Sequence, residues 1–143
     1  MKSRGKIAAI TVMFFLPIML YSAVCEKEWQ DVGLPGFTEG AGYFSSLFVY
    51  DGIPYAAYAD VEHENRLSVM KYSGTSWEYV GAPGFTGGRA AFISLYVYNG
   101  MEYVSFYNAD ANKTEVMRYN GTNWEVLGNI GEGGQWTSLS VYG

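Results

Sequence analysis

The sequence is poor in cysteine, histidine and positive charge, and each shortage excludes a class of protein. One cysteine cannot form an intramolecular disulfide or a cysteine-based zinc site, and a single histidine leaves zinc without a second imidazole ligand. Nine Lys and Arg residues stand against 14 Asp and Glu residues, for a net charge of −5. Because acidic surfaces repel phosphate backbones, we expect no nucleic-acid partner. We expect no cofactor either.

The remaining composition favours short strands and tight turns. Aromatic residues make up 17% of the 143 residues and glycines number 18, whereas charged residues reach only 16%. Aromatic side chains suit strands and glycines suit turns, so the mixture predicts an all-β protein rather than long helices, a coiled coil or a disordered tail. The length leaves room for one domain or a piece of one.

Residues 1–25 have the three parts of a secretory signal peptide. Lys2, Arg4 and Lys6 make a basic start, an apolar run follows, and small residues lead up to Cys25. The run is shorter than the roughly 20 apolar residues of a membrane span, so we expect no span in the mature chain. We predict cleavage after Cys25, which leaves six basic against 14 acidic residues, and a secreted or cell-surface protein.

Two other interpretations of this segment stay open. The apolar run could serve as an uncleaved anchor. Alternatively, Cys25 could be the lipid-modified N-terminus of a surface protein, because its surroundings resemble the bacterial lipoprotein signal. In that signal Gly or Ala stands where this sequence has Val24.

The rest of the chain repeats itself. Trp29, Trp77 and Trp124 are spaced by 48 and 47 residues. Around them, WQDVGLPGFT at 29–38 recurs as WEYVGAPGFT at 77–86, and SLFVYDG at 46–52 recurs as SLYVYNG at 94–100 and as SLSVYG at 138–143. A repeat of this length indicates one supersecondary unit used several times.

Each full repeat predicts four short strands separated by turn signals. In the first repeat, alternating apolar residues and the Asp51-Gly52 turn place strands at 43–50, 54–59, 66–72 and 77–80, with a polar loop at 60–65. Four antiparallel strands at this period are typical of a β-propeller blade, although a tandem of two-layer sandwiches is an alternative.

The predicted organisation is therefore an all-β, incomplete β-propeller. Its parts are a signal peptide at 1–25, the fourth strand of a preceding blade (29–32) and a crossover within 26–42, blade one at 43–81, a crossover at 82–90, blade two at 91–128, and the first strand of a third blade (136–142) within 129–143.

The Trp- and Gly-rich repeats resemble the propeller repeats of secreted bacterial proteins, which are loosely grouped with kelch and sialidase-type (Asp-box) propellers. The resemblance covers about residues 29–143 and implies the propeller fold. The Asp-box pattern itself is met only by Gly74 with Trp77 and by Gly121 with Trp124. The same hairpin also resembles that of small fucose-binding propeller lectins, whose Arg, Glu and aromatic sugar-binding set we cannot place in this sequence.

Two complete blades are fewer than the roughly four to eight of a closed propeller. Further blades would come from a longer polypeptide or from other chains. We expect the former, because a ring of identical chains would join a lone first strand to a lone fourth strand and leave unpaired edges.

In such blades the crossovers and the loops between second and third strands share one rim, where we expect a ligand. The candidate residues there are Phe37, Glu39, Asp60, Glu62, His63, Glu64, Phe85, Arg89, Asn108, Asp110, Asn112 and Lys113. Loop positions that differ between the copies are free to specialise.

Several rim residues admit a chemical and a structural interpretation. Asp60, Glu62 and Asp110 could give oxygens to calcium, but the EF-hand Gly and distal Glu are missing, so we expect a solvated turn and no metal site. Phe37 and Phe85 could form an aromatic platform for a sugar or fill gaps between blades.

The sequence predicts a binding protein better than an enzyme. No Ser or Cys is tied by a motif to the single histidine, His63, so no nucleophile is indicated. We expect a secreted, non-enzymatic propeller segment that binds a glycan or protein. The alternatives are a fragment of a sialidase-like glycoside hydrolase or lyase whose catalytic residues lie elsewhere, and a structural repeat of a large adhesin.

Overall fold

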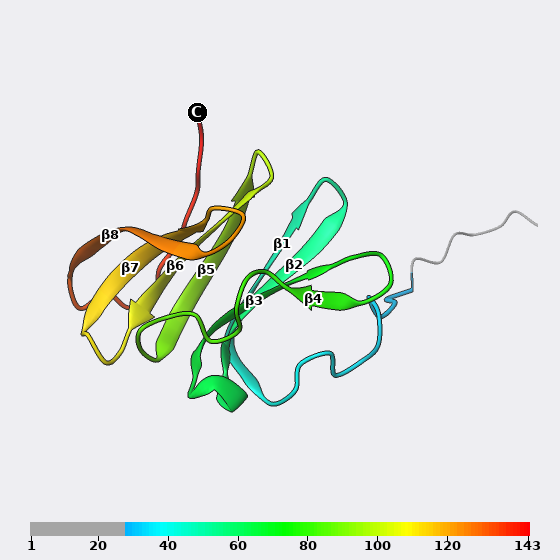
Figure 1. Cartoon of the computed structure of the whole chain (residues 1–143), viewed down its shortest axis with the longest axis horizontal. Coiled ribbons are helices and arrows are strands. Elements are labelled where there is room, and N and C mark those ends of the chain that lie inside the picture. The colour runs from blue at the N-terminus through cyan, green and yellow to red at the C-terminus, as the bar shows by residue number, and fades with distance from the viewer. Residues whose placement is uncertain (1–27) are drawn as a thin grey trace, which may run out of the picture.

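The chain forms two four-stranded antiparallel sheets that lie side by side (Figure 1). The computed structural model describes residues 28–143, so the predicted signal peptide lies outside the described residues. The first sheet contains β1 (Gly42–Tyr50), β2 (Ile53–Asp60), β3 (Arg66–Tyr72) and β4 (Trp77–Tyr79), with the short 3-10 helix η1 (Val61–His63) between β2 and β3. The second sheet contains β5 (Ala90–Tyr98), β6 (Met101–Asn108), β7 (Lys113–Tyr119) and β8 (Trp124–Glu132).

Both sheets keep their strands in chain order, β1-β2-β3-β4 and β5-β6-β7-β8. The first hairpin of each sheet turns through two residues of positive φ, Asp51 and Gly52 in the first sheet and Asn99 and Gly100 in the second. Such turns match the twist of the strands that they join. The predicted all-β class and the four strands of each repeat are therefore confirmed. No helix of the described residues is long and apolar enough to cross a membrane.

The core lies between the two sheets. The first sheet contributes Tyr55, Ala57, Ala59, Leu67 and Val69 from β2 and β3, and the second contributes Ile93, Leu95, Val97, Val104, Phe106 and Met117. Phe48 and Tyr50 of β1 pack against the edge of this cluster. One face of each sheet is thus used in the contact, and the opposite face of each points away from it.

Two predicted strands are wrong. Residues 29–32 and 136–142 are irregular rather than β-strands. A strand needs a neighbour for its ladder of backbone hydrogen bonds, and neither segment is paired with a strand of the two sheets. Both segments are instead held by side chains, as the next two contacts show.

The contacts of these two segments repeat those between the sheets. Trp124 Nε1 of the second sheet donates to the carbonyl of Val80 in the first at 2.8 Å, and Trp77 Nε1 donates to the carbonyl of Val32 at 2.8 Å. Val32 and Val80 occupy the same place in the repeat. The Trp side chain of each sheet therefore makes the same hydrogen bond to the repeat unit that precedes it.

A second contact between successive units also repeats, and it involves β1, β5 and the C-terminal segment. The backbone N–H of Leu95 donates to Ser46 Oγ at 3.0 Å, and that of Leu139 donates to Ser94 Oγ at 3.0 Å. The C-terminal segment thus lies against β5 as β5 lies against β1. Successive units are therefore joined by the same two hydrogen bonds, and this regular stacking brings their loops to one end of the molecule.

Candidate functional site

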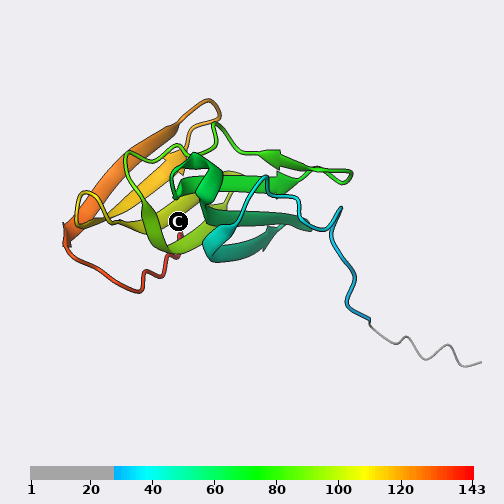
Figure 2. The same ribbon diagram turned by 90° about the horizontal axis from the view of Figure 1, so that it is seen from below.

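The loops predicted to form a rim meet at one end of the molecule. Figure 2 looks from the end where η1 lies and shows η1 beside the crossover that joins the sheets. The N–H of Val61 donates to the carbonyl of Ala41, and a side chain added at Gly84 would collide with the His63 side chain. Arg89 N donates to Asp110 Oδ2 at 2.9 Å. The crossovers 37–41 and 84–89 and the loops 60–65 and 108–113 therefore form one surface, which we name the rim.

Asp60 is the buried centre of the first half of the rim. Its side chain is only 2% exposed. One carboxylate oxygen accepts from the N–H of Glu62 and so caps η1. The other accepts from Ser68 Oγ at 2.8 Å and lies 2.9 Å from His63 Nδ1. Asp60 thus fixes the loop and is not displayed to a ligand.

This Asp–His–Ser grouping does not have the geometry of a nucleophilic triad. In a triad the hydroxyl bonds to the imidazole, whereas Ser68 Oγ donates to the carboxylate of Asp60 itself. Ser68 is fully buried, and its oxygen also accepts from the N–H of Gly84. The grouping therefore joins β2, β3 and the crossover.

Asn108 occupies the equivalent place in the second half of the rim. It is 4% exposed, and its Oδ1 accepts from the N–H groups of Asp110 and Ala111. Next to it, Lys113 Nζ pairs with Glu115 at 2.8 Å, and Asn112 Oδ1 accepts from the hydroxyl of Tyr107 at 2.8 Å. Asn108, Asn112 and Lys113 thus also serve the loop conformation.

Two ion pairs occupy part of the exposed charge of the rim. Arg89 Nε donates to Asp110 Oδ1 at 2.8 Å, and this hydrogen bond lowers the pKa of the Asp110 carboxyl. Glu64 accepts from Arg66 at 2.8 Å. Glu39 and Glu62 are exposed, and Glu62 lies against Gly40 of the preceding crossover.

Phe37 and Phe85 lie in the crossovers with one ring face covered. Phe37 stacks on Trp77 with ring centroids 4.2 Å apart, and Phe85 stacks on Trp124 at 4.3 Å. Both phenylalanines therefore pack between neighbouring units, which is the gap-filling role that the sequence allowed.

The described residues contain no group of three or more His, Cys, Asp or Glu side chains that could hold a metal ion. Of the three residues considered for calcium, Asp60 accepts from η1 and Ser68 and Asp110 accepts from Arg89, so two of the three carboxylates already have protein donors. We therefore propose no calcium site.

The sequence analysis did not identify a row of aromatic rings at the rim, with one ring in β1, one in β5 and one in the segment that follows β8. Phe44, Phe92 and Trp136 precede the repeated Ser-Leu pair of each unit by two residues, and that shared spacing could have revealed them. Phe44 and Phe92 lie 5.4 Å apart between ring centroids, and Phe92 and Trp136 lie 5.1 Å apart. Phe44 is 51% exposed and Trp136 is 83% exposed.

All three residues of this aromatic row have positive φ, at 53°, 51° and 69°. In β1 and β5 they sit where the strand register shifts. A bulky residue in this conformation costs about 1–3 kcal/mol, and such strain gathers at functional sites. Together with Ser45, Ile93 and Thr137, the row lines a depression of about 220 Å³.

No family model matches this chain, and no curated protein matches it. What the chain does has to be argued from its own residues.

Proposed function

We propose that the chain is a segment of a secreted β-propeller that binds a glycan at the cell surface without catalysing a reaction. The support for a propeller is the recurrence of the inter-unit contacts. The same Trp-to-carbonyl hydrogen bond and the same Ser-to-backbone hydrogen bond each occur twice, one unit apart. A constant step between four-stranded sheets is what a ring of blades requires.

The two outer faces support the presence of further units. Leu47 and Val49 of β1 are 75% and 65% exposed, and Leu127 and Ile130 of β8 are 51% and 69% exposed. Apolar faces of this kind mark contact surfaces. We propose that further units of the same repeat, from the same polypeptide or from other chains, cover them.

The aromatic row carries the proposal of glycan binding. Phe44 and Trp136 are exposed and Phe92 is half-buried between them, and all three are held at the rim by backbone of positive φ. A pyranose can stack its C–H face on such a ring while its hydroxyl groups, which lie at the edge of the sugar, remain free to form hydrogen bonds. The pairing of Arg66 with Glu64 and of Arg89 with Asp110 occupies these four charges, and the rings supply the apolar contact surface of the rim.

The experiment is a glycan array probed with the chain, followed by titration of the best glycan against two variants. Phe44→Ala removes one ring of the row and should weaken binding at least tenfold. Leu47→Ala removes a more exposed apolar side chain outside the row and should leave binding unchanged. An array without signal, or a Phe44→Ala variant that binds normally, would contradict the proposal. Capture of a protein by the same surface would replace the glycan by a protein ligand.

A further inference from the structure

The depression of about 220 Å³ beside the aromatic row is built from one residue pair that is used three times. Each repeat unit contributes an aromatic residue and the residue that follows it, so the lining consists of Phe44-Ser45, Phe92-Ile93 and Trp136-Thr137. The step from ring to ring repeats as well, with a tilt of 51° in both pairs and centroid separations of 5.4 Å and 5.1 Å. The depression is therefore shared by three successive units and belongs to none of them alone.

Further repeat units would extend this depression and leave it open. Phe92 already has a neighbouring ring on either side, Phe44 and Trp136, and it is still only half-buried. The rings lie at the rim end of the units, whereas neighbouring units pack on the faces of the sheets, where the core lies. In a closed ring of blades, one such aromatic residue from each unit would gather around the axis. The proposed propeller thus surrounds the depression with further rings.

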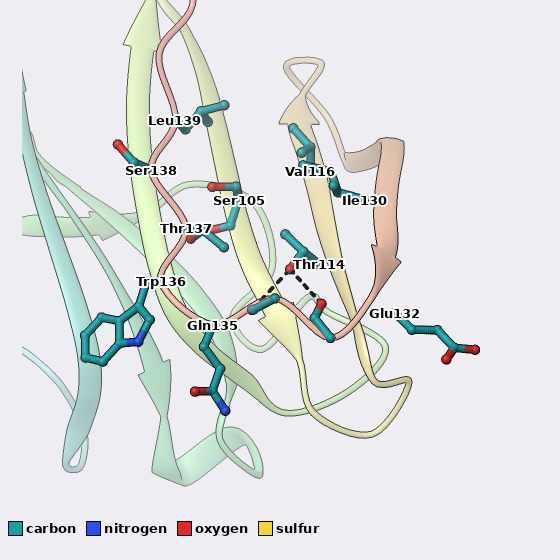
Figure 3. A pocket seen from close by; sticks show the side chains of 12 residues that line it. Ser105, Thr114, Val116, Ile130, Glu132, Gln135, Trp136, Thr137, Ser138 and Leu139 are labelled. Carbon is teal, nitrogen blue, oxygen red and sulfur yellow. Dashed lines mark hydrogen bonds between the residues drawn. The ribbon is translucent and has the colours of Figure 1, made fainter.

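Contacts within the protein hold the row in place. Thr137 Oγ1 donates to the carbonyl of Phe92, and this bond joins the C-terminal segment to β5 beside the two rings. Figure 3 shows Thr137 directed toward Ser105 of β6 and Trp136 directed to the other side of the segment. Tyr107 of β6 packs against Phe92 with ring centroids 6.4 Å apart. The rings are therefore positioned before a ligand binds, which lowers the cost of binding.

The size of the depression limits what can enter it. Small-molecule sites usually span about 300–1,000 Å³. The depression, at about 220 Å³, is smaller and suits a single sugar ring. An internal residue of a glycan carries the chain on two sides, whereas a terminal residue carries it on one side only. A pyranose surrounded by rings from several units can keep only one side free, so the geometry favours a terminal residue.

The lining also limits the charge of the ligand. None of its six residues carries a titratable side chain. A carboxylate placed there would lose its water without meeting a counter-charge, and the net charge of −5 would repel it further. The exposed Ser45 offers a hydroxyl to the edge of a sugar, and the rings offer apolar faces to its C–H groups. These groups suit a neutral pyranose.

We propose that the aromatic row recognises the neutral terminal residue of a glycan, which enters the depression end-on and is contacted by one ring from each of several units. The inference rests on the proposed glycan-binding function and adds which part of the glycan is bound. It leads to two expectations. The affinity should not depend on the length of the chain behind the terminal residue, and an acidic terminal residue should not be accepted.

The test is calorimetric titration of the full chain with three series of neutral saccharides. Each series runs from the methyl glycoside to the disaccharide and the trisaccharide of glucose, galactose or mannose. We expect at least one series to bind, with affinities that differ less than threefold from one to three residues. The methyl uronide that corresponds to the bound methyl glycoside should bind at least tenfold more weakly.

Two variants and a matched control connect this binding to the row. Trp136→Ala and Phe92→Ala each remove one ring and should weaken binding at least tenfold. Trp29→Ala removes another fully exposed tryptophan, which lies outside the row, and should leave binding unchanged. The melting temperature controls for folding. Trp136 is 83% exposed, so its replacement should leave the melting temperature unchanged even if Phe92→Ala lowers it.

An affinity that rises more than threefold with chain length would overturn the inference, because the glycan would then lie along several units. Absence of binding in all three series, equal binding of the uronide, or binding that survives the loss of Trp136 would overturn it as well. If the array glycan is still bound in a Phe44-dependent manner, only the end-on inference fails. If the array is silent, the proposed function fails with it.

Discussion

The two sheets share many residues at equivalent positions but bury them differently. Leu95 and Val97 of the second sheet are 4% and 2% exposed, whereas Leu47 and Val49 of the first are 75% and 65% exposed. On the opposite faces the order reverses. Val80 of the first sheet is 4% exposed and Leu127 of the second is 51% exposed.

The difference shows that burial in this molecule comes from the neighbouring unit and not from the sheet itself. A four-stranded sheet has two apolar faces and can cover neither alone. The first sheet covers one face of the second, and the second covers one face of the first. The equivalent leucines therefore give an internal measurement of what one neighbour contributes to stability.

The largest expected effect comes from truncating the two leucines separately. Leu95→Ala should lower the free energy of unfolding by about 3 kcal/mol, because it removes buried methyl groups and leaves a cavity. Leu47→Ala is the matched control and should change it by less than about 0.5 kcal/mol. Urea denaturation of the full chain measures both. Equal effects would mean that the first sheet's outer face is covered in solution.

A smaller effect compares the apolar and hydroxyl versions of one repeat position, Ala57 in β2 and Ser105 in β6. Ala57→Ser places a hydroxyl in the filled core and should cost about 1–2 kcal/mol of unfolding free energy. Ser105→Ala makes the reverse change in the second sheet, where Ser105 Oγ is buried without a hydrogen-bond partner among the described residues, and should cost nothing or stabilise the chain slightly. Thermal melts of the two variants measure the difference. If Ala57→Ser were neutral and Ser105→Ala destabilising, the surroundings of the two positions would not differ as described.

The sequence was sufficient for the eight strands of the two full repeats, because strand alternation and turn residues are local signals. Tyr72 and Trp77 frame a turn in the structure as the spacing indicated, and the Asp51-Gly52 turn is where the Gly placed it. The prediction of strands at 29–32 and 136–142 was wrong, and the reason is non-local. Their residues match the repeat, but strand formation depends on a partner that the described chain does not supply.

The candidate site was less predictable than the fold. Loop position correctly brought Asp60, His63, Arg89 and Asp110 to one end, but the sequence did not reveal that Asp60 is buried and that Asp110 is paired with Arg89. Side-chain partners in loops are set by three-dimensional approach, as with the His63 contact at Gly84. The sequence also did not reveal the positive φ of Phe44 and Phe92, because each residue stands within a stretch whose alternation indicates a regular strand.

The smallest effect concerns Glu102, a carboxyl that only the second sheet carries, since the equivalent residue of the first is Pro54. Glu102 is 6% exposed, and burial raises the pKa of its carboxyl despite the opposing attraction of Lys71. The folded chain therefore holds this proton to higher pH than the unfolded chain does. The resulting stabilisation is complete below the unfolded pKa, about 4.3, and is lost as the pH rises through the folded pKa.

Glu102→Gln should accordingly melt at a higher temperature than the unchanged chain at pH 7, and the two should melt together near pH 4. Glu125→Gln is the control with the opposite sign. Hydrogen bonding to Arg118 lowers the pKa of the Glu125 carboxyl, so its stabilisation is present above the unfolded pKa and lost on acidification. That variant should melt no higher than the unchanged chain at pH 7. A Glu102→Gln variant with the same melting temperature difference at both pH values would show that burial of this carboxyl does not distinguish the two sheets.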